Sequence, residues 1–278
     1  MAILALDAGT TGVTALVVSD SGAVISRGYR EFLQYFPEPG FVEHEPEEIW
    51  QATVAAATEA LSQTTTPLSA IGITNQRETI VLWDKNTLRS PRKAIVWQDR
   101  RTAELVQQLK ASGLEPRIQK LTGLGLDPYF SSSKLLWLSI NEPELWLAVN
   151  EGSLRIGTVD SYLVARLTAG AAHVTDASNA SRTQLLDISS GSWSDELLEV
   201  FNVPKSALPK VVPSYGEIAR TDPSSFLNLS LPITGIAGDQ QAALFGQTAF
   251  TVGEGKCTYG TGAFMLTNTG SKIIESQN

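Results

Sequence analysis

Short apolar runs separated by glycine-rich turns dominate the first thirty residues. The alternation of apolar and polar positions predicts strands at residues 3–7, 13–19 and 23–30, with tight turns at 8–12 and 20–22 between them. Two successive hairpins of this kind form an antiparallel meander. The chain therefore opens with a small antiparallel sheet before its first helix.

Apolar residues at helical spacing follow this meander. The segment EPEE at residues 45–48 is typical of a helix start, because proline is tolerated in the first turn and acidic side chains favour the positive helix end. Helical patterns lie at about residues 45–61, 101–112, 134–140, 159–167, 195–201 and 239–249. Apolar runs that predict further strands lie at residues 70–74, 79–83, 93–97, 233–237 and 263–267. Strands that alternate with helices after a meander indicate a mixed α/β fold.

The composition is that of a globular protein, with 278 residues, 42% apolar residues and a formal net charge of −8. This length allows one large domain or two small ones, and the negative charge weighs against a nucleic-acid partner. The one cysteine, Cys257, cannot form an internal disulfide and is expected to be structural. No apolar run approaches a membrane span, and no charged segment precedes residues 3–6. We therefore expect a soluble cytoplasmic protein without a membrane partner or a signal peptide.

The first turn reads DAGTTG from Asp7 to Gly12. Its glycines can expose backbone N–H groups, and Thr10 and Thr11 add hydroxyl donors, a combination that suits phosphate oxygens. Asp7 could hold a cation directly or through water. The alternative is a glycine-rich β-turn in which Asp7 makes local hydrogen bonds, and the spacing alone favours this alternative.

A second carboxylate follows an apolar run in GIAGDQQAALFG, residues 235–246. Asp239 is expected at a helix N-terminus, where the helix field favours the ionised form and a base is ready at neutral pH. Two carboxylates at strand ends, Asp7 and Asp239, fit metal-assisted phosphoryl transfer, with one acid for the metal and one for the proton of a hydroxyl. The alternative is that Asp239 is a helix N-cap.

Three further segments carry candidate binding side chains. TNQRET places Arg77 and Glu78 after an apolar run, where they suit the hydroxyl groups of a ligand at the strand ends. Trp97 could cover the carbon backbone of a polyol, and Tyr129 offers another hydroxyl. YGTGAF, residues 259–264, is a second Gly-Thr-Gly turn that could face the same phosphates. Taken singly, each also fits a structural role as a solvated loop, a core tryptophan, a structural tyrosine or an ordinary turn.

The order of the motifs along the chain resembles that of one family. Nine segments carry the likeness: DAGTTG, GFVEHEPEEIW, GITNQRET, AIVWQDRRT, GLDPYFSSSK, GTVDSYLVARLT, HVTDASNASRT, GIAGDQQAALFGQ and YGTGAFMLTNTG. Together they resemble the glycerol kinases of the FGGY carbohydrate kinase family over almost the whole chain. Glycerol kinases match more closely than the sugar kinases of that family at NQRET, DPYFS, DASNASRT and GDQQAALFGQ.

This resemblance implies an α/β fold, an actin-like ATPase or ribonuclease H-like lobe with a mixed sheet, an antiparallel N-terminal meander and flanking helices. It implies a polyol-binding domain at residues 1–250 and the truncated start of an ATP-binding domain at residues 251–278. The implied activity is the ATP-dependent phosphorylation of glycerol to glycerol 3-phosphate, with Mg²⁺ as cofactor. As a fragment the chain is expected to be weak or inactive, and the full-length protein is expected to be a homo-oligomer.

The resemblance also implies a role for each candidate residue. Asp239 is expected to take the proton from the terminal hydroxyl of glycerol, and Asp7 and Asp239 are expected to hold Mg²⁺. The implied glycerol contacts come from Arg77, Glu78, Trp97, Tyr129, Asp239, Gln240 and Phe264. The implied phosphate contacts come from Thr10, Thr11, Gly260, Thr261 and Gly262.

Two positions depart from the family pattern. Thr14 stands where many glycerol kinases carry an arginine, which weakens the expected contact with the γ-phosphate. Ser225 stands where some bacterial members carry a histidine that a phosphotransfer protein modifies, so we expect no such regulation.

Two other functions stay open on the sequence alone. One is another FGGY kinase, acting on a polyol or sugar such as erythritol or xylulose, and the other is a non-catalytic sensor or scaffold.

Overall fold

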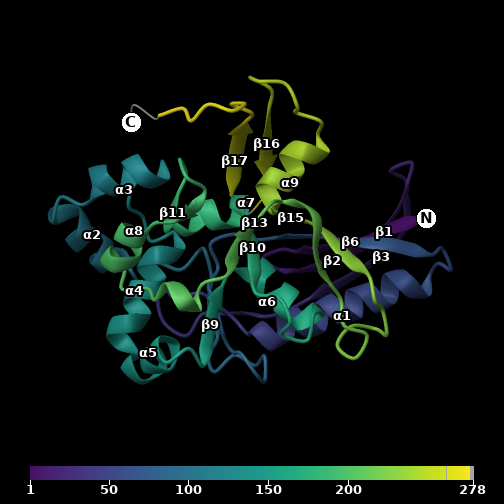
Figure 1. Ribbon diagram of the computed structural model, residues 1–278, viewed down its shortest axis with the longest axis horizontal. Helices are drawn as coiled ribbons and strands as arrows, with labels where there is room; N and C mark the ends of the chain where they lie inside the picture. The colour runs from purple at the N-terminus through teal and green to yellow at the C-terminus, as the bar shows by residue number, and fades with distance from the viewer. Residues whose placement is uncertain (261, 276–278) are drawn as a thin grey trace.

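The computed structural model describes residues 1–260 and 262–275, and this part of the chain contains a six-stranded mixed sheet beside a helical region (Figure 1). The strand order is β14-β15-β6-β1-β2-β3. These strands are β1 Ala2–Ala8, β2 Gly12–Ser19, β3 Val24–Glu31, β6 Leu68–Asn75, β14 Tyr215–Arg220 and β15 Pro232–Gly238. The strands β1, β6 and β15 are parallel, whereas β2, β3 and β14 are antiparallel to their neighbours. The predicted antiparallel meander is therefore confirmed.

The three parallel strands end level with one another. Ala8 of β1 pairs with Asn75 of β6, and Asn75 pairs in turn with Gly238 of β15. Adjacent strands lie about 4.8 Å apart, so the residues that follow these three positions emerge side by side at one edge of the sheet. In open α/β sheets, ligands bind just beyond such carboxyl ends. The topology therefore brings three separate chain segments to one candidate site.

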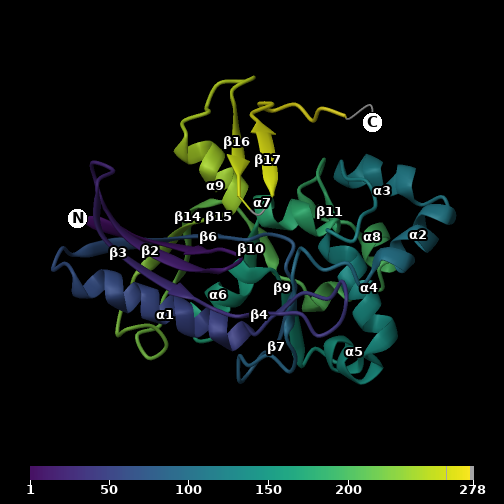
Figure 2. The same ribbon diagram turned by 180° about the vertical axis from the view of Figure 1, so that it is seen from behind.

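Helices α1 (Pro46–Ser62) and α6 (Val159–Leu167) cover one face of the sheet, and both views place them on the same side (Figures 1 and 2). The period-two pattern of β1 accounts for this arrangement. Leu4 and Leu6 are buried in the core formed with these helices, whereas Asp7 points to the other face and is exposed. The sheet therefore has one face that belongs to the main core and another that is open beside Asp7.

Helix α1 starts and packs as the sequence predicts. Pro46 lies in its first turn, and Glu47 and Glu48 lie near its positive end. The helix approaches β3 closely at Gly28, where a Cβ would lie 2.1 Å from the carbonyl oxygen of Ala56. A larger residue at this position would push the helix away from the sheet.

A second core belongs to a helical region beside the sheet (Figure 1). Its helices are α2 Ala103–Ala111, α3 Glu115–Thr122, α4 Ser131–Asn141, α5 Pro143–Asn150 and α8 Asp195–Val200. They pack around the antiparallel strands β7 (Val81–Asp84) and β9 (Leu154–Gly157). The sequence pattern does not predict α3 or α5, and for α5 the reason is that the proline at position 143 reads as the end of one helix although it also occupies the first turn of the next.

Short elements connect the two cores. They are β4 Gln34–Tyr35, β5 Glu43–His44, β8 Ala94–Ile95, β10 Val174–Asp176, α7 Ala177–Ala180, β11 Leu186–Asp187, β12 Ser192–Trp193 and β13 Lys210–Val212, with 3₁₀ turns at Ser181–Thr183 and Lys205–Ala207. Strands β10 and β13 form a parallel pair. Helix α7 follows β10 directly, and it packs against β15 near the carboxyl edge of the sheet.

Helix α9 (Asp239–Gly246) follows β15 and ends at Gly246, earlier than the predicted end near residue 249. Strands β16 (Gly255–Tyr259) and β17 (Ala263–Thr267) then form a separate antiparallel hairpin, as the second glycine turn predicts. Both views place α9 and this hairpin on the side of the sheet opposite to α1 (Figures 1 and 2). Within the described residues, the helices are too short or too polar to cross a lipid bilayer.

Candidate active site

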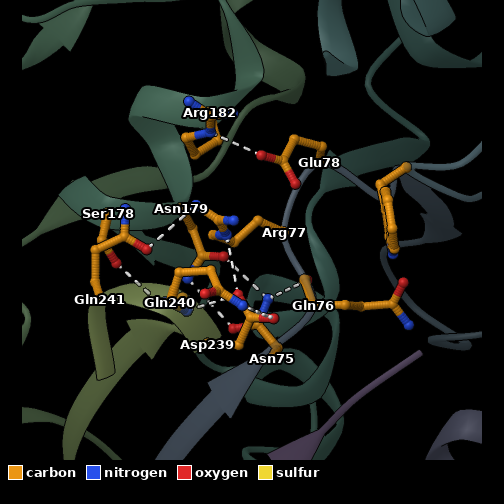
Figure 3. A network of polar contacts seen from close by, with 12 residues as sticks. Asn75, Gln76, Arg77, Glu78, Ser178, Asn179, Arg182, Asp239, Gln240 and Gln241 are labelled. Atoms are coloured by element: carbon orange, nitrogen blue, oxygen red, sulfur yellow. Dashed lines mark hydrogen bonds and ion pairs between the residues drawn. The ribbon is translucent and has the colours of Figure 1, made fainter. Parts of the chain in front are cut away.

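Arg77 and Asp239 meet at the carboxyl edge of the sheet. Arg77 follows the end of β6, and Asp239 directly follows β15 as the first residue of α9. Nε of Arg77 donates a hydrogen bond to Oδ1 of Asp239 at 3.0 Å (Figure 3), and the two side chains are 5% and 36% exposed. The alternative that Asp239 is a helix N-cap is wrong, because Gly238 occupies that position. The contact with the buried guanidinium fixes the orientation of this carboxylate, and its exposed part is open to a ligand.

Glu78 is held in an unusual conformation beside Arg77. Its φ is 63°, in the left-handed region that non-glycine residues rarely adopt, and its side chain is 1% exposed. Nε of Arg182 donates to its Oε1 at 2.7 Å (Figure 3), and Oγ of Ser131 donates to its backbone carbonyl at 2.9 Å. Backbone strain of this kind costs about 1–3 kcal/mol and gathers at functional sites. The alternative that this segment is a solvated loop is wrong, because residues 75–79 are buried.

Three aromatic rings form the opposite wall of the site. Trp97 packs edge-on against Tyr129 and Phe264, with centroid distances of 5.7 and 6.2 Å. The guanidinium carbon of Arg77 lies 5.7 Å from the centre of the Phe264 ring. Nε1 of Trp97 donates a hydrogen bond to Oγ1 of Thr10 at 2.9 Å, so this wall contacts the opening turn. Trp97 and Tyr129 are both only half-buried, which leaves their faces available to a ligand.

These side chains line a cavity of about 180 Å³, called the polar cavity below. Its lining is Thr10, Gln76, Arg77, Glu78, Trp97, Tyr129, Asp239, Gln240, Thr258, Gly260, Gly262 and Phe264. Typical small-molecule pockets measure about 300–1,000 Å³, so the polar cavity suits a ligand of few atoms. Charged and amide groups face aromatic carbon across it, which suits a short molecule with both hydroxyl and C–H groups.

The polar cavity gathers most of the residues that the sequence singles out. All seven side chains expected to contact glycerol line it, and so do Thr10, Gly260 and Gly262 of the two expected phosphate turns. Thr11 is exposed and does not belong to the lining. Thr261 lies outside the described residues. The two turns therefore reach the same cavity from opposite ends of the chain.

Gln76 and Thr258 also line the polar cavity, although the sequence motifs do not indicate a role for either residue. Nε2 of Gln76 donates to the carbonyl of Gly9 at 2.8 Å, and Nζ of Lys256 donates to Oγ1 of Thr258 at 2.6 Å. The available signal was their position, within TNQRET and directly before YGTGAF. Cys257 is a free cysteine, exposed on β16.

Asp7 lies beside the polar cavity and outside its wall. It pairs with Thr74 of β6, which pairs in turn with Ala237, two residues before Asp239. Its exposed side chain borders a larger hollow of about 650 Å³ between the sheet and α9. Desolvation by the surrounding protein, and next the negative charge of Asp239, raise the pKa of the Asp7 carboxyl to about 6. The two acids thus act on one another, as expected for carboxylates that share a region of the surface.

A magnesium ion fits this pair of acids. Proteins usually bind Mg²⁺ through one or two carboxylates, with substrate phosphates and water as the other ligands. Asp7 and Asp239 supply two carboxylates, and a cation near them would offset the charge of Asp239, which after desolvation is the second cause of the raised pKa of Asp7. Oγ1 of Thr74, the neighbour of Asp7, is buried and has no hydrogen-bond partner within the described residues, so it is available to an additional ligand or water.

The chain belongs to the FGGY family of carbohydrate kinases, because residues 2–246 match the N-terminal domain of that family. Its relatives include glycerol kinases. It is 48% identical to the glycerol kinase of Geobacillus sp. strain WCH70 and 50% identical to that of Koribacter versatilis, over 99% of this chain and 56% of each relative. The chain therefore spans just over half the length of these curated relatives.

Solved structures show the same fold. The glycerol kinase of Plasmodium falciparum with ADP superimposes with a TM-score of 0.93 at 36% identity, over 99% of this chain and 56% of that one. The xylulose kinase of Rhodospirillum rubrum superimposes with a TM-score of 0.87 at 22% identity, over 95% of this chain and 54% of that one. The predicted fold class, an actin-like ATPase or ribonuclease H-like lobe, is confirmed by these neighbours.

Proposed function

We propose that this chain is the polyol-binding part of a glycerol kinase, which transfers the γ-phosphoryl group of ATP to glycerol and forms glycerol 3-phosphate and ADP. Relatives named glycerol kinase, 46–50% identical to this chain, support the proposal. The observation that carries it is the polar cavity, where Asp239 lies near the Arg77–Glu78 pair in a space suited to a very small polyol. Residues 1–250 would form the polyol-binding domain, and residues 251–278 would begin the ATP-binding domain.

Glycerol would lie between a polar and an aromatic wall. The Glu78 carboxylate would accept hydrogen bonds from its hydroxyl groups, and the buried Arg77 guanidinium would donate to their oxygens. Desolvation, and next the charge of Glu78, raise the pKa of the Tyr129 phenol, so Tyr129 stays protonated and can also donate. The rings of Trp97 and Phe264 would cover the C–H groups of the polyol.

Asp239 would act as the general base. As the terminal hydroxyl oxygen of glycerol attacks the γ-phosphorus, the carboxylate takes its proton, and ADP leaves with the electrons of the broken O–P bond. The hydrogen bond from Nε of Arg77 to Oδ1 fixes the orientation of this carboxylate. A positioned base contributes about 10²–10⁴-fold to the rate, and the remainder comes from positioning and charge stabilisation.

The two glycine turns would hold the phosphates of ATP. Thr10 and Thr11 in the opening turn and residues 260–262 in the second turn offer backbone N–H and hydroxyl groups to phosphate oxygens. Magnesium, held by Asp7 and Asp239, would neutralise phosphate charge during the transfer. Thr14, the register partner of Asp7, cannot supply the cationic contact that an arginine would make there.

The full-length product of the reading frame that encodes this chain is the protein to test. Its kcat/KM is measured with ATP and glycerol, erythritol or xylulose. We expect the value for glycerol to be at least about tenfold higher than the value for either of the other two substrates. A higher value for erythritol or xylulose would assign another FGGY kinase instead. Glycerol binding without turnover of any of the three substrates would assign a sensor or scaffold.

The 278-residue chain is tested in parallel. Calorimetric titration with glycerol is expected to show weak binding, because the polar cavity is formed by this chain. Turnover of glycerol as fast as that of the full-length product would contradict the proposed division into two domains. A cytoplasmic location, a homo-oligomeric state and the absence of nucleic-acid and membrane partners stay predictions.

A further inference from the structure

We propose that the segment Asp176–Arg182, which does not line the polar cavity, positions both the base and the glycerol-binding carboxylate of the proposed kinase. Ser178 would do so through the backbone of Gly238, and Arg182 through its ion pair with Glu78. This inference rests on the proposed function. It assigns positioning roles to side chains that lie outside the lining of the polar cavity.

The first contact fixes the backbone directly before the base. Oγ of Ser178 accepts a hydrogen bond from the amide of Gly238 at 2.8 Å, and Asp239 is the next residue. Gly238 is also tightly enclosed on its other side, because a Cβ there would lie 2.5 Å from Cδ of Arg77. Two independent contacts, one on the backbone and one on the carboxylate, therefore define where Asp239 points.

Asp176 fixes the hydroxyl of Ser178. Oγ of Ser178 donates to Oδ2 of Asp176 at 2.6 Å, which leaves its lone pairs for the Gly238 amide. The fully buried Asp176 carboxylate also accepts from Oγ of Ser214 at 2.7 Å and from the side-chain and backbone nitrogens of Asn179 at 2.9 and 3.0 Å. A buried carboxylate with this many donors is rigid, so Ser178 has little freedom to turn away.

An amide pair connects the same segment to the end of β6. Nδ2 of Asn75 donates to Oδ1 of Asn179 at 3.0 Å, and Nδ2 of Asn179 donates back to Oδ1 of Asn75 at 3.3 Å (Figure 3). Both side chains are fully buried. Since Asn75 precedes Arg77 by two residues, α7 is joined to both strand ends that carry the Arg77–Asp239 pair.

Arg182 supplies the second positioning contact. Its Nε donates to Oε1 of Glu78 at 2.7 Å, and its guanidinium lies over the Phe130 ring at 4.9 Å and the Tyr129 ring at 5.5 Å. Glu78 is strained at its backbone and nearly fully buried, so a partner charge beside it is required to keep the carboxylate in place. Arg182 therefore sets the direction from which Glu78 faces the polar cavity.

The test compares Ser178→Thr with Ser178→Val in the full-length product. The two side chains have the same shape, so their difference isolates the hydroxyl group. We expect the valine variant to have a kcat about tenfold below that of the threonine variant, with glycerol KM values within about twofold, because the base is misplaced while glycerol still binds. Ser26→Ala, which removes another buried serine hydroxyl far along the sheet, is the control for lost stability.

Arg182→Met is expected to change the glycerol KM more than kcat, the reverse of the effect of Ser178→Val. Glycerol KM should rise at least about tenfold with a smaller change in kcat, because the variant removes the partner of Glu78 and spares Asp239. Arg117→Met, which breaks an exposed ion pair with Glu196, is expected to leave both constants within about twofold. A general loss of stability would move kcat and KM alike in both variants and would not produce this split.

A measurement without turnover completes the test. Amide exchange of Gly238 in the 278-residue chain is followed by NMR, and Ser178→Val should exchange at least about tenfold faster there than Ser178→Thr, because the amide loses its acceptor. Equal kcat values and equal exchange rates for the two variants would overturn the positioning role of Ser178. If the unmodified enzyme does not phosphorylate glycerol but Gly238 exchange responds as expected, the proposed function fails while the hydrogen bond itself stands.

Discussion

Nε of Arg77 lies 3.0 Å from Oδ1 of Asp239, although 162 residues separate the two along the chain. The contact follows from the sheet, where β6 and β15 are parallel neighbours and Asn75 lies opposite Gly238. Each strand ends at this level, so the residues that follow emerge on the same side. The pairing of β6 with β15 therefore brings the candidate base and its cationic partner together.

Replacing Asp239 by asparagine tests the base directly. In Asp239→Asn, Oδ1 can still accept the hydrogen bond from Arg77, but the side chain can no longer take a proton. We expect kcat of the full-length product to fall about 10²–10⁴-fold, while glycerol affinity changes less than about tenfold. Asp195→Asn, which alters an 82% exposed aspartate, is the control. Persistent activity in Asp239→Asn would show that another group accepts the proton.

The close approach of Arg77 to Gly238 requires a residue without a Cβ at this position. In Gly238→Ala, the new methyl group would lie 2.5 and 2.7 Å from Cδ and Cγ of Arg77, so the arginine must move away from Asp239. We expect kcat/KM for glycerol to fall at least about tenfold and the free energy of unfolding to drop by about 1–3 kcal/mol. Gly72→Ala on the adjacent strand is the control, because its Cβ meets no described atom within 4 Å. Equal behaviour of the two variants would contradict this reading of Gly238.

Two neighbouring threonines are expected to respond differently. Thr10→Val removes the acceptor for Nε1 of Trp97 and should raise KM for both glycerol and ATP several-fold, because the aromatic wall and the phosphate turn both lose a contact. Thr11→Val alters an exposed residue outside the polar cavity and should raise KM for ATP alone. Steady-state kinetics with each substrate varied in turn separate the two. An identical pattern in both variants would remove the assigned link between Thr10 and Trp97.

Asp7 gives the proposed metal site a pH dependence. Its pKa of about 6 means that the carboxyl loses its charge as the pH falls through 6, so KM for magnesium–ATP should rise below that pH. In the 278-residue chain, Asp239→Asn should lower the pKa of Asp7 but leave it above 3.8, because desolvation is the larger cause and persists. Carboxyl ¹³C NMR titration checks both values.

His44 should make the fold less stable in weak acid. Its ring is fully buried and packs edge-on against Phe32 at 4.9 Å, and burial lowers its pKa to about 4. The unfolded chain binds the proton near pH 6.5, so stability present above that pH is lost as the pH falls towards 4. From this cause, the free energy of unfolding should fall by about 2 kcal/mol between pH 7 and pH 5. In His44→Leu, urea unfolding at the two pH values should show that much less difference, and an unchanged difference would refute the assignment.

Local patterns were sufficient to predict much of the fold. The alternation in β1 and β2, the helix start at Pro46 and the end of α6 follow from nearest neighbours in sequence, and the structure confirms them. Lys134 could not be predicted in this way, because a lysine usually reads as exposed. Its ammonium is fully buried and donates to the carbonyls of residues 128–130, at distances of 2.7 to 3.1 Å.

The candidate site was predictable only in part, for a similar reason. Arg77, Glu78 and Asp239 belong to motifs that the sequence displays, and the structure brings them together. The partners that hold them are distant along the chain. Arg182 lies 104 residues from Glu78, and Ser178 lies 60 residues from Gly238. Such contacts depend on the three-dimensional path of α7, which no local pattern in a single sequence encodes.

One wall of the polar cavity is carried by the β16–β17 hairpin, which contributes Gly262 and Phe264. In the described part of the chain this hairpin forms its own sheet and packs on α9. The width of the polar cavity therefore depends on where the hairpin lies against α9, as well as on which side chains line the cavity. In the proposed kinase, a mutation that shifts the hairpin would therefore change the size of substrate accepted without contacting the substrate.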